Sequence, residues 1–254
     1  MSWNPQQYSR FTGQRLRPAL DLIARIPIEH PNTVIDLGCG TGNVTRVLRG
    51  RWPDAGIVGV DGSPQMLSEA QKATGDIGWE LADLADWNPQ ERFDLVFSNA
   101  ALHWLDDHPA LFERLSAKIA AGGVLAVQMP RNFDAPSHKL MHELAASPPW
   151  RDTLAKLLRP QPVLSAEAYH GLLAPHTRSL DIWETEYLQV LEGENPVAEW
   201  IKGTWLAPLL NALAPGARAA FESEYRIRVA RAYPQQRDGT TLFPFRRLFI
   251  VASF

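Results

Sequence analysis

The chain has 254 residues, with 25 basic and 28 acidic side chains, a net charge of −3 and 45% hydrophobic residues. This ordinary globular balance argues against a protein that mainly binds the nucleic-acid backbone, because such binding needs an excess of Lys and Arg. A chain of this length buries a large core without disulfides or structural metals, and its single cysteine, Cys39, excludes an internal disulfide and a multi-thiolate metal site.

The sequence is typical of a cytoplasmic protein. Residues 1–10 are polar and contain no secretory hydrophobic stretch. No apolar run approaches the roughly 20 residues that are needed to cross a bilayer. No repeat, low-complexity tract or long charge block divides the chain, so we expect one large domain, alone or with a smaller lid.

The first half of the chain alternates strand and helix patterns. A leading helix is predicted from Leu16, Leu20 and Ile23, which share one helical face, and a later one is predicted to begin after the capping residue Ser63. Short apolar runs predict buried parallel strands at 33–37, 57–61, 79–83, 93–99 and 124–128. A helix is expected around Leu111–Ile119, ended by Gly122-Gly123. This alternation predicts an α/β fold with a doubly wound, mostly parallel sheet.

The second half has a different pattern. Residues 135–175 are helical and broken by prolines, 180–191 alternate like a strand, and two helical stretches precede a closing strand at 248–252. The two late strands would complete a seven-stranded sheet. We therefore expect a ligand-binding core, a helical lid segment, and late strands that carry a helical lid insertion; the predicted boundaries are 1–134, 135–177, 178–254 and, for the insertion, about 195–233.

The most informative motif follows the first predicted strand and reads Asp36-Leu-Gly-Cys-Gly-Thr-Gly42. Its three glycines let the backbone turn tightly from strand to helix and approach a ligand closely. The spacing is not the G-x-G-x-x-G of dinucleotide-binding loops, and the Lys-Ser/Thr of a P-loop is missing. A tight turn without a ligand is the alternative, which the acids that follow in the sequence disfavour.

Three acids lie at or near the ends of the first three strands. Asp61 ends the second strand, where its two oxygens could accept both hydroxyls of a ribose. Asp83 ends the third, where it could accept from an adenine amino group while Leu84 supplies its backbone N–H. Asp36 lies inside the first strand, and its burial is costly unless a cationic amino group or loop N–H groups pair with it.

These elements, in this order, resemble class I S-adenosylmethionine-dependent methyltransferases over about residues 33–130. In that family the glycine loop and its preceding acid hold the methionine part of the cofactor, the second acid holds the ribose and the third holds the adenine. The resemblance implies a Rossmann-like fold, S-adenosylmethionine as the cofactor, S-adenosylhomocysteine as its product, and no metal. The cofactor-binding residues that it implies are Asp36, Gly38, Gly40, Gly42, Asp61, Gly62, Met66, Asp83, Leu84, Asn99 and Arg17. For Met66 and Arg17, plain core packing and a plain surface helix are the alternatives.

Further segments extend the resemblance to members of the family that methylate one carboxylate of a small tricarboxylic acid. These segments are Trp3–Tyr8, Arg15–Pro18, Asn99–Trp104, Gln128–Pro130 and Arg247–Ala252. A carboxylate is already ionised at pH 7, so no general base and no catalytic side chain is expected, only alignment and preorganised electrostatics. The expected partner is a small polycarboxylate, with no nucleic acid, membrane or obligate protein partner.

A trianionic acceptor needs cations and neutral donors around it, and arginine offers a planar fork for each carboxylate. The predicted substrate-binding residues are Tyr8, His103, Trp104, Arg131, Lys202, Arg246 and Arg247. Each also has a plainer interpretation: the cations as solvated surface charges, Tyr8 as part of a plain surface helix, His103 as a helix-start residue bonded to backbone, and Trp104 as core.

Other functions stay open from the sequence alone. The nearest is a methyltransferase for another small acid or a phenol. Less favoured are a nicotinamide dehydrogenase, whose phosphate-binding spacing is missing, and a cofactor-binding module without catalysis. The run Ser98-Asn-Ala-Ala101 lacks the Asn/Asp-Pro-Pro-aromatic motif that holds a nucleobase or amide nitrogen, which disfavours methylation of nucleic acids and protein amides.

Overall fold

The computed structural model describes residues 12–73 and 75–254 and divides them into two compact units. The sheet unit comprises Arg15–Pro130, Pro162–Thr185 and Arg247–Phe254. The helical unit comprises Arg131–Gln161 and Glu186–Arg246, together with residues 12–14 of the described chain. The predicted lid segment 135–177 is thus divided in the sequence, because residues 162–177 belong to the sheet unit.

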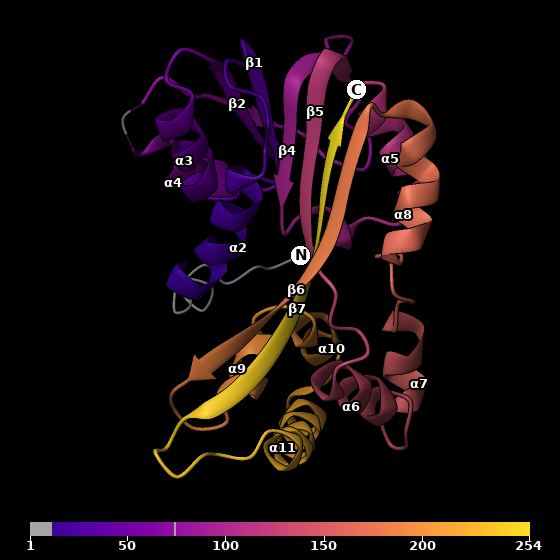
Figure 1. Ribbon diagram of the computed structural model, residues 1–254. Helices are drawn as coiled ribbons and strands as arrows, with labels where there is room; N and C mark the ends of the chain where they lie inside the picture. Colours follow the sequence, from indigo (N-terminus) through magenta and orange to yellow (C-terminus); the bar gives the residue numbers. More distant parts are fainter. Residues whose placement is uncertain (1–11, 74) are drawn as a thin grey trace. The chain divides into compact units, whose positions relative to one another are not determined.

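A seven-stranded sheet of order β3-β2-β1-β4-β5-β7-β6 confirms the predicted fold class (Figure 1). The first five strands pair in parallel, and β7 runs antiparallel to β5. The carboxyl ends of β1 to β5 therefore share one edge of the sheet, which is where ligands of open α/β sheets bind. The strands are β1 (Thr33–Leu37), β2 (Gly56–Asp61), β3 (Gly78–Leu81), β4 (Phe93–Asn99), β5 (Ile119–Pro130), β6 (Ser179–Leu191) and β7 (Thr241–Ser253).

Helices flank this sheet within the sheet unit. Helices α3 and α4 contact β2, α4 also contacts β3, and α5 contacts β5 and α8; Figure 1 draws the two pairs on opposite sides of the sheet. Helix α4 begins as the sequence predicts, because the Ser63 hydroxyl accepts from the Met66 N–H at 3.3 Å and Pro64 occupies the first helical position. The helices of this unit are α2 (Thr12–Ala24), α3 (Asn43–Arg51), α4 (Pro64–Gln71), η1 (Leu102–Trp104), α5 (His108–Ser116), α8 (Ala166–Leu173) and η3 (Ala174–His176).

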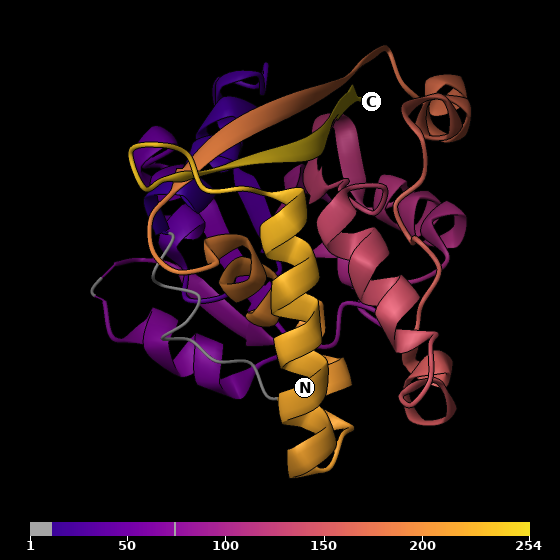
Figure 2. The same ribbon diagram turned by 90° about the horizontal axis from the view of Figure 1, so that it is seen from below.

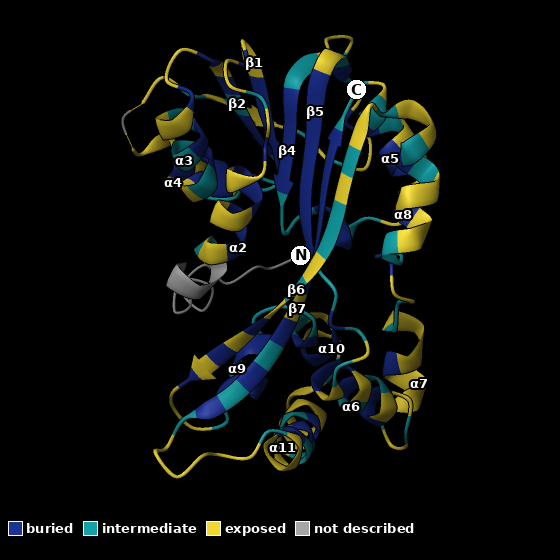
Figure 3. Ribbon diagram, viewed as in Figure 1, coloured by how far each residue is buried: buried dark blue, intermediate teal, exposed yellow. Residues whose placement is uncertain are grey.

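The centre of the sheet is its most buried part. In β4 and β5 the stretches Leu95–Ser98 and Val124–Met129 are buried without interruption, which appears as dark blue in Figure 3. Such continuous burial is expected for strands covered on both faces. The edge strand β3 is exposed along most of its length, so the rigid support for a site lies on β1, β4 and β5.

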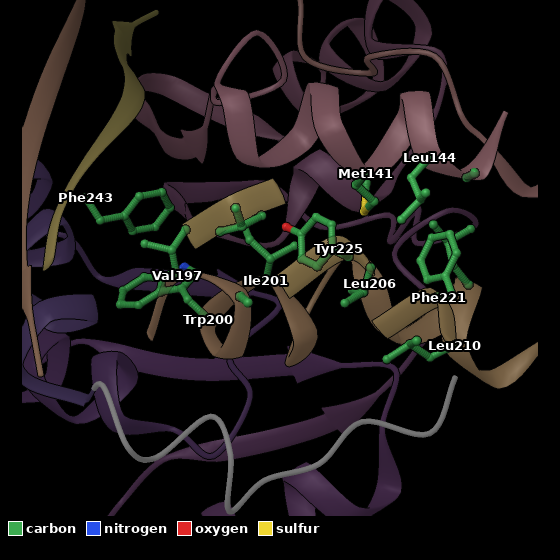
Figure 4. Close-up of a cluster of buried hydrophobic side chains, with 14 of the residues drawn as sticks. Met141, Leu144, Val197, Trp200, Ile201, Leu206, Leu210, Phe221, Tyr225 and Phe243 are labelled. Atoms are coloured by element: carbon green, nitrogen blue, oxygen red, sulfur yellow. The ribbon is translucent and has the colours of Figure 1, made fainter. Parts of the chain in front are cut away.

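The helical unit has a hydrophobic core of its own. Helix α11 contacts α6, α9 and α10, and Figure 2 shows α11 and α6 side by side. Phe221 and Tyr225 of α11 pack there with Met141 and Leu144 of α6 (Figure 4). The Tyr225 hydroxyl donates to the Ser137 carbonyl at 3.0 Å, so the buried phenol is satisfied. The helices are α6 (Pro136–Ala145), α7 (Arg151–Leu154), η2 (Ala155–Leu157), α9 (Pro196–Lys202), α10 (Leu206–Asn211) and α11 (Pro215–Ala232).

Three predicted boundaries are corrected by the structure. Helix α5 ends at Ser116, and the Gly122-Gly123 pair lies inside β5 instead of ending that helix. The register between β4 and β5 shifts there, and a Cβ atom on Gly123 would lie 2.9 Å from the Ala120 carbonyl oxygen, so the glycine permits the irregular strand. Strand β3 ends at Leu81, two residues before Asp83, and β7 begins at Thr241, well before the predicted closing strand.

Among the residues that the structure describes, no helix combines the length and the apolar character that crossing a bilayer requires.

Candidate functional site

The glycine loop lies between β1 and α3 in the sheet unit. Gly38, Gly40 and Gly42 all have positive φ angles, of 77°, 56° and 75°. A Cβ atom on Gly38 would lie 2.1 Å from the Ala101 Cβ, and one on Gly42 would lie 2.4 Å from the Trp79 ring, so both positions need glycine for packing. At Gly40 no described atom lies within 4 Å of such a Cβ, so the backbone there faces open space that a ligand can enter.

Backbone donors fix this loop against the end of β2. The Gly38 and Cys39 N–H groups donate to the Val60 carbonyl at 2.8 and 3.0 Å. The Asp61 carboxylate accepts from the Gly40 N–H and the Ser63 N–H, each at 2.9 Å and each on a different oxygen. Each carboxylate oxygen has room for a second donor, so Asp61 can still bind two hydroxyls of a ligand. Asp61 thus lies beside the glycine loop, as the sequence predicts, and its hydrogen bonds to the loop are an addition from the structure.

Asp36 is the most deeply buried acid of the loop region, with 2% of its surface exposed. Its Oδ2 accepts from the Thr45 hydroxyl at 2.6 Å. Burial raises the pKa of this carboxyl to about 7; the Thr45 hydrogen bond lowers it, and the nearby Asp61 carboxylate raises it further. A cationic group bound beside Asp36 would therefore restore its charged form.

Cys39 lies in the same loop and is buried. Its thiol donates to the Gly40 carbonyl at 3.8 Å. Burial, and then the carboxylates of Asp36 and Asp61, raise the pKa of the Cys39 thiol far above its ordinary value. The thiol is therefore neutral at physiological pH.

The third acid lies on the surface after β3. Asp83 is exposed, and its Oδ1 accepts from the Ala85 N–H at 2.9 Å. The Ala82 N–H donates to the Asp61 carbonyl at 3.2 Å, which ties this segment to β2. The Leu84 carbonyl accepts from Arg114, Gly62 is exposed, and Met66 is buried in α4. Gly62 directly follows β2, and the Ala82 hydrogen bond brings the start of the Asp83–Leu84 segment beside the same strand end.

The end of β4 carries the next group of predicted residues. The Oδ1 atom of Asn99 is buried and has no hydrogen-bond partner within the described residues. Ala100 follows in the left-handed region with φ 55°, and its N–H donates to the Gln128 carbonyl at 2.9 Å. His103 is buried in η1, and its ring centroid lies 4.7 Å from that of Trp104.

The side chains of Arg246 and Arg247 lie on opposite faces of β7, because successive residues of a strand point to opposite sides. Arg247 is 4% exposed, and its Nη1 donates to the Gln128 Oε1 at 3.1 Å, within the sheet unit. Arg246 is exposed and belongs to the helical unit. Its backbone N–H and C=O bond the Asn132 side chain at 2.7 and 2.8 Å.

The remaining predicted substrate residues are dispersed. Arg131 and Arg246 line a cavity of about 510 Å³ in the helical unit, with Asp134, Glu186 and Tyr233 also in its wall. Lys202, in α9, forms an ion pair with Glu222 of α11. Arg17 is exposed on α2, and Tyr8 lies outside the described residues.

Gln128 is a candidate site residue that the sequence analysis does not include. It is a fully buried amide in an otherwise apolar strand, directly beside Asn99 in the sheet register. A polar residue at the carboxyl end of an apolar run was the available signal.

Comparison with known proteins identifies relatives over nearly the whole chain. Residues 9–179 match the family described as "Methyltransferase domain". The chain is 46% identical over 251 residues to a trans-aconitate 2-methyltransferase of Azoarcus sp. (strain BH72), covering 99% of this chain and 98% of the relative. A trans-aconitate 2-methyltransferase of Streptomyces coelicolor is 47% identical over 262 residues, covering 99% of this chain and 86% of the relative.

Solved structures support the fold. Haemonchus contortus phosphoethanolamine N-methyltransferase 2 in complex with S-adenosyl-L-methionine has a TM-score of 0.56 at 17% identity, covering 93% of this chain and 52% of that one. The plantazolicin methyltransferase BpumL, in a complex that contains SAH, has a TM-score of 0.53 at 12% identity, covering 98% of this chain and 90% of that one.

Replacement of Asp61 by alanine is expected to weaken binding of S-adenosylhomocysteine by about 10- to 100-fold, because ribose hydroxyls lose a charged acceptor. Isothermal titration measures this. Asp94→Ala is the matched control: Asp94 also accepts two backbone N–H groups, from Asn32 and Thr33, but at the opposite end of the sheet. Equal affinity losses in both variants would remove Asp61 from the cofactor site.

Asp36 is expected to make the folded state less stable as the pH rises. The pKa of this carboxyl is about 7 in the folded protein against an ordinary value of 3.8, so between these values the folded state holds the extra proton. The free energy of unfolding should therefore fall from about pH 4 to about pH 7 and then level off. Asp36→Asn keeps an acceptor for Thr45 and should remove this fall in the free energy of unfolding, as measured by urea unfolding between about pH 4 and about pH 7. If both proteins lose stability in parallel over this range, Asp36 is not the group responsible.

Proposed function

Because the chain belongs to the methyltransferase domain family, we propose that it transfers the methyl group of S-adenosylmethionine to one carboxylate of trans-aconitate, giving a mono-methyl ester. The chain is an S-adenosylmethionine-dependent methyltransferase. The choice of acceptor rests on the similarity to relatives that are named trans-aconitate 2-methyltransferases. This similarity extends through both units of the chain and not only through the sheet unit.

The residues of the sheet unit fit S-adenosylmethionine. Gly40 leaves open space beside the loop, and Asp61 keeps acceptor capacity for the ribose. The buried Asp36 carboxyl gains a stable charge when a cation lies beside it, which suits the amino group of the methionine part. The hydrogen bond from Ala82 to Asp61, directly before Asp83 and Leu84, supports the assignment of these two residues to the adenine.

When bound, S-adenosylmethionine would supply a methyl group attached to a positively charged sulfur, and a carboxylate oxygen would take over this methyl group in line while the sulfur leaves. The chain's own task is then to align the acceptor and exclude water. A carboxylate is ionised at neutral pH, so no side chain has to remove a proton from it. This agrees with a site whose buried groups are hydrogen-bond donors, acceptors and one guanidinium, and whose Cys39 thiol is neutral.

Arg247 is the cation that best suits the acceptor. It is buried on the same sheet as the cofactor loop, and the guanidinium offers two parallel donors to a carboxylate. Arg131, Arg246 and Lys202 belong to the helical unit, and Lys202 is already paired with Glu222. A role for these three in binding the remaining carboxylates stays a prediction.

Incubation of the purified chain with S-adenosylmethionine and a panel of acceptors tests the proposed activity. Mass spectrometry should detect a mono-methyl ester from trans-aconitate, with a higher kcat/KM than for cis-aconitate, citrate or a phenol. A clear preference for another panel member would replace the acceptor while keeping the reaction. Absence of methyl transfer to every compound, with S-adenosylmethionine bound, would favour a module without catalysis.

Arg247→Met is expected to lower kcat/KM for the acid by about 10- to 100-fold, because hydrogen bonds to a charged group are lost. Affinity for S-adenosylhomocysteine should not change. Arg92→Met is the matched control, since this exposed arginine directly precedes β4 at the amino-terminal end of the strand, away from the candidate site. Equal losses in the two variants, or equal losses of acid and cofactor binding, would contradict the assignment to Arg247.

A further inference from the structure

Gln128 is a buried amide whose orientation is fixed by its neighbour. Its side chain is fully buried in β5, and its Oε1 accepts from Arg247 Nη1 at 3.1 Å. A guanidinium only donates hydrogen bonds, so the atom of Gln128 that faces it has to be the carbonyl oxygen. The Nε2 group therefore points away from Arg247, and within the described residues it has no hydrogen-bond partner.

A buried amide nitrogen without an acceptor is costly, since it has given up its hydrogen bonds to water. Such groups are rare in folded proteins and call for a partner that completes them. The neighbouring buried positions of β5, Leu125 to Val127 and Met129, are apolar or small, so packing alone does not account for an amide here. A bound molecule with hydrogen-bond acceptors would complete the two N–H donors of this amide.

The place of Gln128 in the sheet points to the ligand site. It pairs in register with Asn99 at the carboxyl ends of two adjacent parallel strands. Phe97 pairs with Asp36 of β1, and residues two apart share a face, so Asp36, Asn99 and Gln128 all lie on the same side of the sheet. A molecule bound at this edge next to the glycine loop therefore reaches Gln128 from the cofactor's side.

The chemistry of the donor set selects an anion. Gln128 Nε2 donates only, and the guanidinium of Arg247 adds a positive charge directly beside it. Both the acceptor acid and the methionine part of the cofactor carry a carboxylate, which only accepts hydrogen bonds. The acceptors Asp36 and Asn99, on β1 and β4, suit the amino group of the cofactor. Gln128 and Arg247 lie farther along the sheet, on β5 and β7, which favours a carboxylate of the acceptor acid as their ligand. We infer that Gln128 is a substrate-binding residue, whose amide nitrogen donates to a carboxylate of the acceptor acid while Arg247 fixes its orientation. This inference rests on the proposed function.

Gln128→Glu tests the inference with little change of shape. The new side chain still accepts from Arg247, but the N–H donors are replaced by a negatively charged oxygen. Trans-aconitate is titrated into the protein saturated with S-adenosylhomocysteine, and its Kd should rise by about 10- to 100-fold. The Kd of S-adenosylhomocysteine alone should stay unchanged, and in turnover KM for the acid should rise by more than kcat falls.

Met129→Leu is the matched control, because the adjacent residue is equally buried on the opposite face of β5 and the exchange conserves volume. It should leave both affinities unchanged. Unaltered affinity for the acid in Gln128→Glu, or an equal loss of affinity for S-adenosylhomocysteine, would overturn the inference and assign the amide to the cofactor or to the fold.

The titration separates this inference from the proposed function because it does not depend on turnover. If the wild-type protein binds and methylates the acid and Gln128→Glu does so equally well, only the inference is overturned. Wild-type protein that binds the acid but forms no ester overturns the proposed reaction, while the effect of Gln128→Glu on binding still decides the inference. Wild-type protein that binds none of the acids overturns the proposed acceptor class first, and the role of Gln128 with it.

Discussion

The contact between the glycine loop and the Asp61 carboxylate is the interaction on which the site depends. One carboxylate accepts from Gly40 and Ser63, so a single side chain fixes the loop after β1 and the turn before α4. The same packing buries Asp36 nearby and raises its pKa. The strand ends β1 and β2 thus form a negatively charged environment held in place by backbone donors, and such an environment favours a cationic ligand.

The strand order places opposite chemistry on the two sides of β4. Asp36 and Asp61 lie on β1 and β2, whereas the Gln128 and Arg247 donors lie on β5 and β7, with the neutral Asn99 between them. The proposed reaction transfers a methyl group from a positively charged sulfur, which leaves as the neutral thioether, to a negatively charged oxygen. A sheet edge that is acidic on one side of β4 and basic on the other would orient both proposed reactants before any bond changes, which is a form of electrostatic preorganisation.

Much of the sheet unit was predictable because its signals are local. Strand β4 matches the predicted range 93–99, Ser63 caps α4, and the glycine loop takes the expected positive φ angles. The rest depends on tertiary contacts. The Gly122-Gly123 pair resembles a helix stop but serves an irregular strand, and Lys202 is neutralised by a residue twenty positions away. Arg246 and Arg247 look like a pair in the sequence, and only the extent of β7 shows that they point apart.

The raised pKa of the Cys39 thiol bears on whether this side chain could itself be methylated. An activated methyl donor is an alkylating agent, and a thiolate is the strongest nucleophile that a protein side chain offers. The one cysteine of this chain lies in the loop expected to hold that donor, yet burial and two neighbouring acids keep its sulfur protonated. Burial therefore keeps this thiol in its weakly nucleophilic, protonated form beside the expected position of the methyl donor.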